Sequence, residues 1–550
     1  MTLVKSFWLL MWDWHGEIKR MMKTAVLTIL SFAKITTSNE TTQKLENNLT
    51  KKKEPNLKTP PNYTKPQLIG LIVGPLLFIT IKLFVAPPDM SSDANTVLAT
   101  AAWIATWWIT EAIPIPITSL LPILIFPLSG VMGTGEVAAS YGDDLIFLFA
   151  GSFMIALAME KWNLHKRVAL SIIAFIGTNP NMIILGFMVA TGFLSMWISN
   201  TATTLMMVPI SLAVTKHVGD LMKNKSKLDI DTTPGNFPFG TALMLGTAYA
   251  ATVGGFGSLV GAPANIILAG TVKELYGVEI SFARWLLFGV PMVVIMIPLI
   301  WFYLTRIAYP MKTKGIPGGR EIIKKDLDGL GKMSYEEKIV LTVFLLMGFG
   351  WITRSFFLNN FIPHLDDTLI ALFGGIILFL IPAKNTIGKI MDWNTALKLP
   401  WGILWLFGGG LALAGGITKS GLNEWIGGRI ASIENMPFIF TIAIVVIMIL
   451  ILTEFTSNTA TATMAYPIVA AVAASIGENP LILMVAANMG ATFAYMFPVA
   501  APPNAIVFGT GYIRMSQMAK TGFWLNLISM IFSIIIVYYY VPIIFGGLMP

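Results

Sequence analysis

Long apolar segments, each near the length needed to cross a lipid bilayer, follow one another through most of this 550-residue chain. Hydrophobic residues make up 55% of the sequence and charged residues only 12%, whereas a typical soluble domain is about 25% charged. A helix needs about 20 consecutive apolar residues to span the hydrocarbon core. We therefore predict an all-α polytopic membrane protein with about eleven transmembrane helices. The predicted spans are 68–86, 96–113, 117–132, 145–159, 239–260, 286–308, 339–356, 368–383, 401–417, 481–510 and 523–546.

Two further apolar stretches, residues 182–214 and 437–475, do not fit this count because the same pentapeptide, Ser-Asn-Thr-Ala-Thr, interrupts both of them. It occupies residues 199–203 in the first stretch and residues 457–461 in the second. The arms on either side are about 15 residues long, which is too short for a full crossing. Polar, irregular backbone at this depth must be buried in protein or line a wet cavity. We predict two re-entrant helical hairpins.

The second half of the sequence repeats the first. With a shift of 258 residues, identical residues in segments 148–209 and 406–467 coincide, including both pentapeptides. With a shift of 239 residues, segment 262–271 matches segment 501–510 in the same way. The two halves are therefore predicted to be one structural unit used twice.

The distribution of basic residues predicts how the two halves are oriented. Segments 216–227 and 306–338 are rich in Lys and Arg, whereas segments 87–95, 133–144 and 357–367 contain neither. Basic loops remain on the cytoplasmic side of a membrane. The repeat is therefore predicted to be inverted, with the first hairpin entering from the cytoplasm and the second from the outer face. We expect a multi-pass protein of the plasma (inner) membrane with a cytoplasmic N-terminus and an extracellular C-terminus.

Four regions follow from this reading. Residues 1–66 are predicted to form a basic cytoplasmic arm without stable structure. Residues 67–310 contain the first transmembrane helix and the first repeat, residues 311–338 form a basic cytoplasmic loop, and residues 339–550 contain the second repeat.

The interrupted segments carry the predicted site. Inverted repeats of secondary transporters build their binding sites from discontinuous helices near the bilayer midplane. Free carbonyl groups at the end of one hairpin arm can hold a small cation, and N–H groups at the start of the next can face a carboxylate. Residues 254–265 and 498–504 place Pro and Gly inside apolar runs, so we expect these two broken helices to converge with the hairpin tips.

Composition excludes several other functions. The chain has no Cys and only four His, which leaves no thiolate metal site and no Cys nucleophile. Its net charge of +8 is explained by cytoplasmic loops facing an anionic leaflet, so no nucleic-acid partner is expected. A channel, or a membrane enzyme with Ser199 or Ser457 as nucleophile, remains a competing hypothesis. However, neither serine has an obvious His or Lys partner, and we predict that the protein is not an enzyme.

The paired Ser-Asn-Thr tips, with Gly261-Ala262-Pro263-Ala264-Asn265 and Ala500-Ala501-Pro502-Pro503-Asn504 downstream, resemble the divalent anion/sodium symporter family. The segments Trp107–Pro114 and Ala505–Gly509 look most like its bacterial dicarboxylate carriers. The resemblance implies a homodimer in which a scaffold domain holds a transport domain that moves like an elevator. It also implies sodium-coupled transport of succinate, fumarate or malate. A sodium-independent dicarboxylate exchanger, or a carrier of citrate or another divalent anion, is the alternative.

The resemblance also assigns residues. It implies two Na+ sites, formed by Ser195, Ser199, Asn200 and the Gly261 carbonyl, and by Thr453, Ser457, Asn458 and the Ala500 carbonyl. It places the dicarboxylate between the two tips, with the substrate contacts Ser199, Asn200, Thr201, Ser457, Asn458, Thr459, Pro263, Ala501 and Pro502. Where the family usually has Thr-Pro-Pro-Asn or a close variant, this chain has Ala262 and Ala501. A hydroxyl group near the site is therefore missing twice.

Overall fold

The computed structural model describes residues 63–85, 87, 89–177, 179–225, 231–311, 326–429 and 436–548. Almost all of the predicted arm at 1–66 lies outside these ranges, as do residues 312–325 of the predicted loop at 311–338. The described residues are helical, apart from loops and one isolated antiparallel bridge between Pro382 and Lys389.

Helices form where the sequence is apolar and end mainly at Gly, Pro and polar breaks. The first helices of the chain are α3 (Lys65–Phe84), α4 (Ser92–Thr110), α5 (Ile115–Thr118), α6 (Leu121–Ser129) and α7 (Thr134–Ser140). The helices that precede the matching segment of the second half are α16 (Tyr335–Thr353), the short 3₁₀ helix η2 (Leu358–Asn360), α17 (Asp367–Leu380) and α18 (Trp393–Ala396).

The two repeats contain matching series of helices. The first series is α8 (Asp144–Lys161), α9 (Leu164–Ile176), α10 (Pro180–Ser195), α11 (Asn200–Lys225), α12 (Pro238–Phe256), α13 (Pro263–Tyr276) and α14 (Phe282–Phe302), which continues as the π-helix η1 (Tyr303–Ala308). The second is α19 (Trp401–Lys419), α20 (Leu422–Arg429), α21 (Phe438–Thr453), α22 (Asn458–Ser475), α23 (Pro480–Thr492), α24 (Pro502–Gly509) and α25 (Met515–Tyr539), followed by α26 (Val541–Phe545). The bounds of α10 and α21 differ by the same 258 residues as the sequence repeat.

Five helical stretches among the described residues are long and apolar enough to cross a membrane. They are Lys65–Phe84, Thr134–Lys161, Phe282–Ala308, Trp401–Lys419 and Met515–Phe545. The count of eleven spans and the inversion of the repeat remain predictions.

Some helix boundaries differ from the sequence predictions. The span predicted at 117–132 is divided between α5 and α6, and Pro122 lies in the first turn of α6, where its missing N–H is tolerated. The span predicted at 481–510 is divided into α23 and α24 by an irregular segment. The second arm of the first hairpin reaches Lys225 rather than residue 214. The sequence predictions did not include α9, α13 and α20 as helices.

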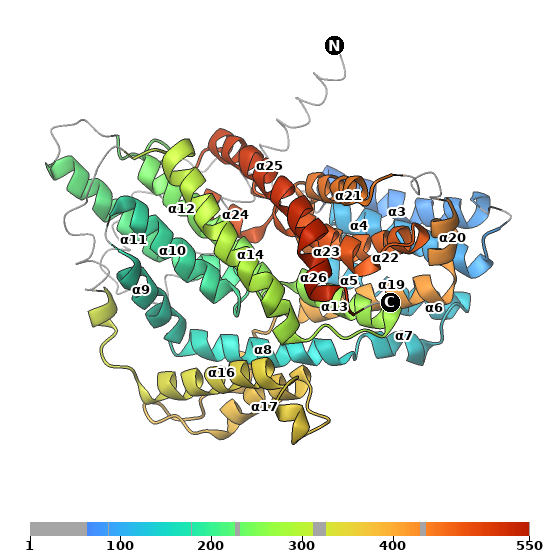
Figure 1. Ribbon diagram of the computed structural model, residues 1–550, viewed down its shortest axis with the longest axis horizontal. Helices are drawn as coiled ribbons and strands as arrows, with labels where there is room; N and C mark the ends of the chain where they lie inside the picture. The colour runs from blue at the N-terminus through green and yellow to red at the C-terminus, as the bar shows by residue number, and fades with distance from the viewer. Residues whose placement is uncertain are drawn as a thin grey trace, which may run out of the picture. The chain divides into compact units, whose positions relative to one another are not determined.

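The two repeats pack against each other through their hairpins. Within the first repeat, α10, α12 and α14 lie side by side (Figure 1). Across the repeats, α11 of the first hairpin packs against α24, and α22 of the second hairpin packs against α13. Each hairpin therefore contacts the broken helix of the other half of the chain.

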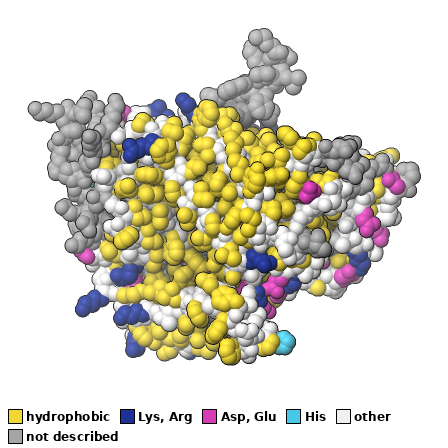
Figure 2. All heavy atoms as spheres, in the orientation of Figure 1, with side chains coloured by type: hydrophobic (Ala, Val, Ile, Leu, Met, Phe, Trp, Pro, Cys, Tyr) yellow, Lys and Arg dark blue, Asp and Glu magenta, His cyan; other side chains and the backbone are white. Residues whose placement is uncertain are grey.

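The surface is suited to lipid. Large apolar side chains such as Leu128, Phe175 and Ile543 are more than two-thirds exposed. Figure 2 shows hydrophobic side chains over most of one face, with Lys and Arg mainly toward its margins. Soluble monomers rarely expose continuous apolar patches of this extent, so this surface is one that contacts the hydrocarbon of a bilayer.

Candidate functional site

The tip of the first hairpin brings a buried hydroxyl group to a side-chain amide. Helix α10 ends at Ser195, and α11 begins at Asn200 after a short turn. Ser195 Oγ lies 2.7 Å from Asn200 Oδ1 and 2.6 Å from the carbonyl oxygen of Ala251 in α12. A hydroxyl group has one proton and can donate to only one of these acceptors at a time. The Ser195 hydroxyl group therefore faces two oxygen acceptors with one proton to donate.

The second hairpin repeats this arrangement. Thr453 ends α21 and Asn458 begins α22. Thr453 Oγ1 lies 2.6 Å from Asn458 Oδ1 and 3.3 Å from the carbonyl oxygen of Ala491 in α23. Ser195 and Thr453 are completely buried. In each of the two predicted cation sites, the structure thus places one hydroxyl group in contact with one side-chain amide.

Two glycines allow further backbone oxygens to approach the first tip. A methyl group added to Gly261 would lie 2.5 Å from the Gly255 carbonyl oxygen and 2.8 Å from the Ser195 carbonyl oxygen. A methyl group added to Gly255 would lie 2.1 Å from Asn200 Oδ1. Backbone atoms leave room only for glycine at position 261, whereas a side chain at position 255 would displace the Asn200 amide. The predicted Gly261 is therefore next to the hairpin tip, where the end of α12 and the turn before α13 also meet.

The remaining predicted cation residues are arranged less symmetrically. Ser199 Oγ accepts a hydrogen bond from the N–H of Ala202 at 3.3 Å, whereas the side chain of Ser457 makes no capping hydrogen bond. Ala500 is buried between α23 and α24, and its N–H donates to the Phe497 carbonyl oxygen at 3.2 Å. No hydrogen bond among the described residues joins Ala500 to the second hairpin.

The predicted substrate residues lie at four helix starts. Asn200 and Thr201 begin α11, Asn458 and Thr459 begin α22, and all four are half-buried. The first N–H groups of a helix have no partner within it and carry the positive end of its dipole. These tips can therefore face an anion without a charged side chain.

The other two helix starts belong to the broken helices. Pro263 begins α13 and Pro502 begins α24. The N-cap residues before them, Ala262 and Ala501, have extended backbone and make no side-chain capping bond. A Ser, Thr, Asn or Asp at these positions would cap the helix itself. Neither helix start therefore has a side-chain cap, but Pro263, Pro502 and Pro503 have no N–H, and the N–H groups of Asn265 and Asn504 donate to the Ala262 and Ala501 carbonyl oxygens.

Buried asparagines hold the broken segments in shape. The side-chain amide of Asn265 donates to the carbonyl oxygens of Gly255 (3.0 Å) and Ser258 (2.7 Å). The amide of Asn504 donates to the Phe497 carbonyl oxygen at 3.2 Å in the other repeat. Asn488 of α23, which sequence reasoning missed, donates to Asn265 Oδ1 at 3.0 Å. The sequence did contain a signal for Asn488, because it is a single amide within the apolar run of α23 and polar residues at such positions are commonly functional.

Glu454 is a second buried residue to which the sequence predictions gave no role. It is 2% exposed and follows α21 directly. Its carboxylate accepts hydrogen bonds from the backbone N–H groups of Tyr495 (2.9 Å), Met496 (3.1 Å) and Phe497 (3.2 Å), and from the amide of Asn526. It therefore ties the second hairpin to the irregular segment between α23 and α24.

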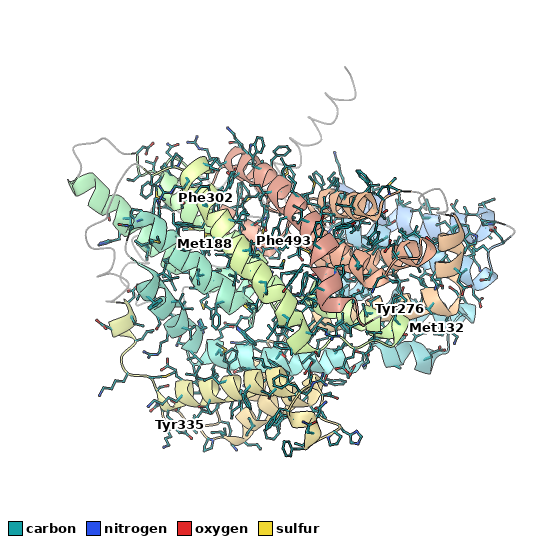
Figure 3. All side chains as sticks on the ribbon, in the orientation of Figure 1. Met132, Met188, Tyr276, Phe302, Tyr335 and Phe493 are labelled. Carbon is teal, nitrogen blue, oxygen red and sulfur yellow. The ribbon has the colours of Figure 1, made fainter. Side chains whose placement is uncertain are left out.

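Contacts between the repeats join the two broken regions. The Tyr466 hydroxyl group of α22 donates to the Ala264 carbonyl oxygen of α13 at 2.9 Å. The rings of Phe256 and Phe493, at the ends of α12 and α23, lie 5.4 Å apart. Figure 3 labels Phe493, which is fully buried within the helix bundle.

Two lysines that coincide in the repeat lie at helix ends and form ion pairs. Lys161 ends α8 and pairs with Asp392 at 2.6 Å, and Lys419 ends α19 and pairs with Glu136. The hydrogen bond from Lys161 holds the pKa of the Asp392 carboxyl group below its usual range. Lys161 therefore contacts the N-cap of α18 and Lys419 contacts α7, and neither ion pair involves a hairpin tip.

Comparison with known proteins decides the family. The family described as the sodium:sulfate symporter transmembrane region matches residues 65–546. The chain belongs to the sodium:sulfate symporter family. This family consists of membrane transporters, so the chain is not an enzyme.

Relatives within the family extend over nearly the whole chain. The sodium-dependent dicarboxylate transporter SdcS of Staphylococcus saprophyticus is 50% identical over 496 residues, which cover 89% of this chain and 94% of that protein. The protein of the same name from Staphylococcus aureus strain USA300 is 50% identical over 501 residues, with 90% and 94% covered.

Solved structures of more distant transporters share the fold. The YdaH transporter of Alcanivorax borkumensis is similar with a TM-score of 0.55 at 13% identity, covering 88% of this chain and 100% of that one. MtrF of Neisseria gonorrhoeae is similar with a TM-score of 0.53 at 10% identity, covering 87% and 96%. At such identities the likeness concerns the fold alone.

Proposed function

We propose that this symporter-family protein carries C4-dicarboxylates such as succinate, fumarate or malate across the plasma membrane together with sodium. The observation that carries the proposal is the repeated hydroxyl–amide pair, Ser195 with Asn200 and Thr453 with Asn458. The relatives named sodium-dependent dicarboxylate transporter support the choice of substrate and cation.

The chemistry of the tips explains why a cation is needed. A dicarboxylate has two negative charges, and their removal from water is costly unless they are paired. Residues 195–204 and 453–461 contain no Lys or Arg. The N-termini of α11 and α22 supply only partial positive charge. Sodium ions held by the neutral oxygens around each tip supply the rest, and they order the tips so that the anion site is complete.

The resemblance to the divalent anion/sodium symporter family supports an elevator-type transport cycle. The loaded site, at the meeting point of the hairpins and broken helices, crosses the membrane as part of a moving transport domain. A scaffold domain stays fixed within a homodimer. The inverted repeat provides equivalent access from both sides, and the N-terminus lies in the cytoplasm and the C-terminus outside. An empty or half-loaded site crosses poorly, because the charges of the sodium ions and of the dicarboxylate then no longer offset each other.

Uptake of labelled succinate by proteoliposomes tests the proposal. We expect an inward sodium gradient to drive accumulation, and uptake without the gradient to fall to the level of empty liposomes. Uptake that ignores sodium but requires dicarboxylate inside the vesicle would replace symport with exchange. Uptake that neither saturates nor shows counterflow would identify a channel instead.

Substitution of Gly255 by alanine should weaken sodium binding. The added methyl group would overlap Asn200 Oδ1 and move the amide away from Ser195. Overpacking of this kind costs about 1–3 kcal/mol, so the sodium concentration for half-maximal uptake should rise roughly tenfold. Gly348→Ala is the matched control, because Gly348 also lies in a helix but has open space around it. Equal sodium dependence in both variants would contradict the assigned site.

A further inference from the structure

A large cavity lies away from the hairpin tips, between the π-helix η1 and the beginning of α25. Its volume is about 670 Å³. One wall comes from η1 and the residues around it, and the other from the first four turns of α25. The lining residues on which the inference rests are Tyr303, Ile307, Tyr309, Ser516, Lys520 and Trp524.

The cavity is chemically divided. Tyr303, Ile307 and Trp524 form an aromatic and aliphatic part, whereas Ser516 and Lys520 provide a polar and cationic part. Lys520 is exposed, and no acidic side chain among the described residues forms an ion pair with it. Tyr, Trp and Lys together are typical of the boundary between hydrocarbon and headgroups. The occupant that fits this division is amphipathic, with a negative group at one end.

The position of the cavity in the chain favours the inner leaflet. Helix η1 ends at Ala308, within the basic segment 306–338 that the sequence places on the cytoplasmic side. Anionic phospholipids make the cytoplasmic leaflet negative, and each nearby Lys gains from that charge. A π-helix also recurs at functional sites, because its extra residue changes the direction of the side chains that follow.

We propose that this cavity is a binding site for one anionic phospholipid. The phosphate group lies at Lys520 and Ser516, and the upper acyl chain lies against Ile307 and Trp524. The cavity also lies next to the irregular segment between α23 and α24 in the second repeat. The Tyr309 hydroxyl group lies 2.9 Å from Thr521 Oγ1, and the next residue, Gly522, packs so closely on the backbone of Tyr495 that an added methyl group would lie 2.3 Å from its carbonyl oxygen. Bound lipid therefore lies one residue from the segment that Glu454 holds.

Native mass spectrometry of the purified full-length protein tests the site. The probes are phosphatidylglycerol and phosphatidylcholine with identical acyl chains. One lysine near an anionic headgroup corresponds to a preference of about fivefold. We expect wild type to retain phosphatidylglycerol over phosphatidylcholine by that factor, and Lys520→Gln to lose the preference. Lys398→Gln, at an exposed lysine outside the cavity, should keep it.

Further measurements distinguish phospholipid binding from the binding of other anions and from the proposed transport activity. Trp524→Ala should reduce retention of both lipids, because it removes an apolar contact rather than a charge. Inorganic phosphate at millimolar concentration should not displace phosphatidylglycerol. Equal retention of the two lipids by wild type, an unchanged preference in Lys520→Gln, or displacement by phosphate would overturn the proposal. These readings do not depend on whether the protein transports succinate.

Discussion

Replacement of Asn200 or Asn458 by alanine is expected to abolish sodium-driven succinate uptake while leaving expression intact. Each amide is paired with a buried hydroxyl group, 2.7 Å from Ser195 Oγ and 2.6 Å from Thr453 Oγ1. In the proposed site the same amides also bind the cation and the carboxylate. A hydrogen bond to a charged group contributes about 1.5–3 kcal/mol. Loss of two such interactions lowers the rate at limiting substrate by at least roughly 100-fold.

The control is Asn394→Ala, which removes an exposed amide from α18. Both tip variants should match this control in yield and in elution from a sizing column. Normal uptake by Asn200→Ala and Asn458→Ala would remove these residues from the site. Loss of uptake in only one variant would show that the two hairpins do not contribute equally, as the asymmetry at Ser199 and Ser457 allows.

Replacement of Glu454 by alanine is expected to destabilise the protein more than any other single change described above. The variant removes the acceptor of the Met496 and Phe497 N–H groups and of the Asn526 amide in a buried region, while the Tyr495 N–H keeps only Asn526 Oδ1 at 3.1 Å. A buried donor without a partner costs about 1–3 kcal/mol. The midpoint of thermal unfolding, measured on the detergent-solubilised protein, should fall by roughly 5 °C or more.

Glu454→Gln should give an intermediate loss. Its single oxygen can still accept from Tyr495 and Met496, but its NH₂ group would face the N–H of Phe497. Glu160→Ala at an exposed position serves as the control and should leave the midpoint unchanged. A midpoint for Glu454→Ala equal to that of the control would mean that the carboxylate does not hold the segment in place.

Local features of the sequence were sufficient to predict the helix breaks at the two pentapeptides. Ser199 and Ser457 lie directly before the second arms, because short polar residues between two apolar runs end one helix and begin another. Ser195 and Thr453 were assigned by the family resemblance, and they also coincide at the shift of 258 residues. In the structure each hydroxyl group lies against the amide of the asparagine five positions later, a contact that was not predicted.

Features that depend on contacts between distant segments could not be predicted. The partners of Glu454 are more than 40 residues away in the sequence, and nothing in its local pattern indicates which N–H groups it reaches. The pairing of Asn488 with Asn265 crosses the two repeats. Helices α9 and α20 are short and carry charged residues, so a search for membrane-length apolar runs passes over them.

The meeting of the two hairpin tips is the central claim, and cysteine cross-linking tests it most directly. The natural chain contains no cysteine, so Thr201→Cys with Thr459→Cys introduces the only two thiols. We predict that a short bifunctional thiol reagent joins them within one chain, and that succinate with sodium slows the reaction. A Thr201→Cys, Asn394→Cys pair should not be joined. Failure of the tip pair to cross-link under any condition, or a rate unaffected by succinate and sodium, would contradict the account.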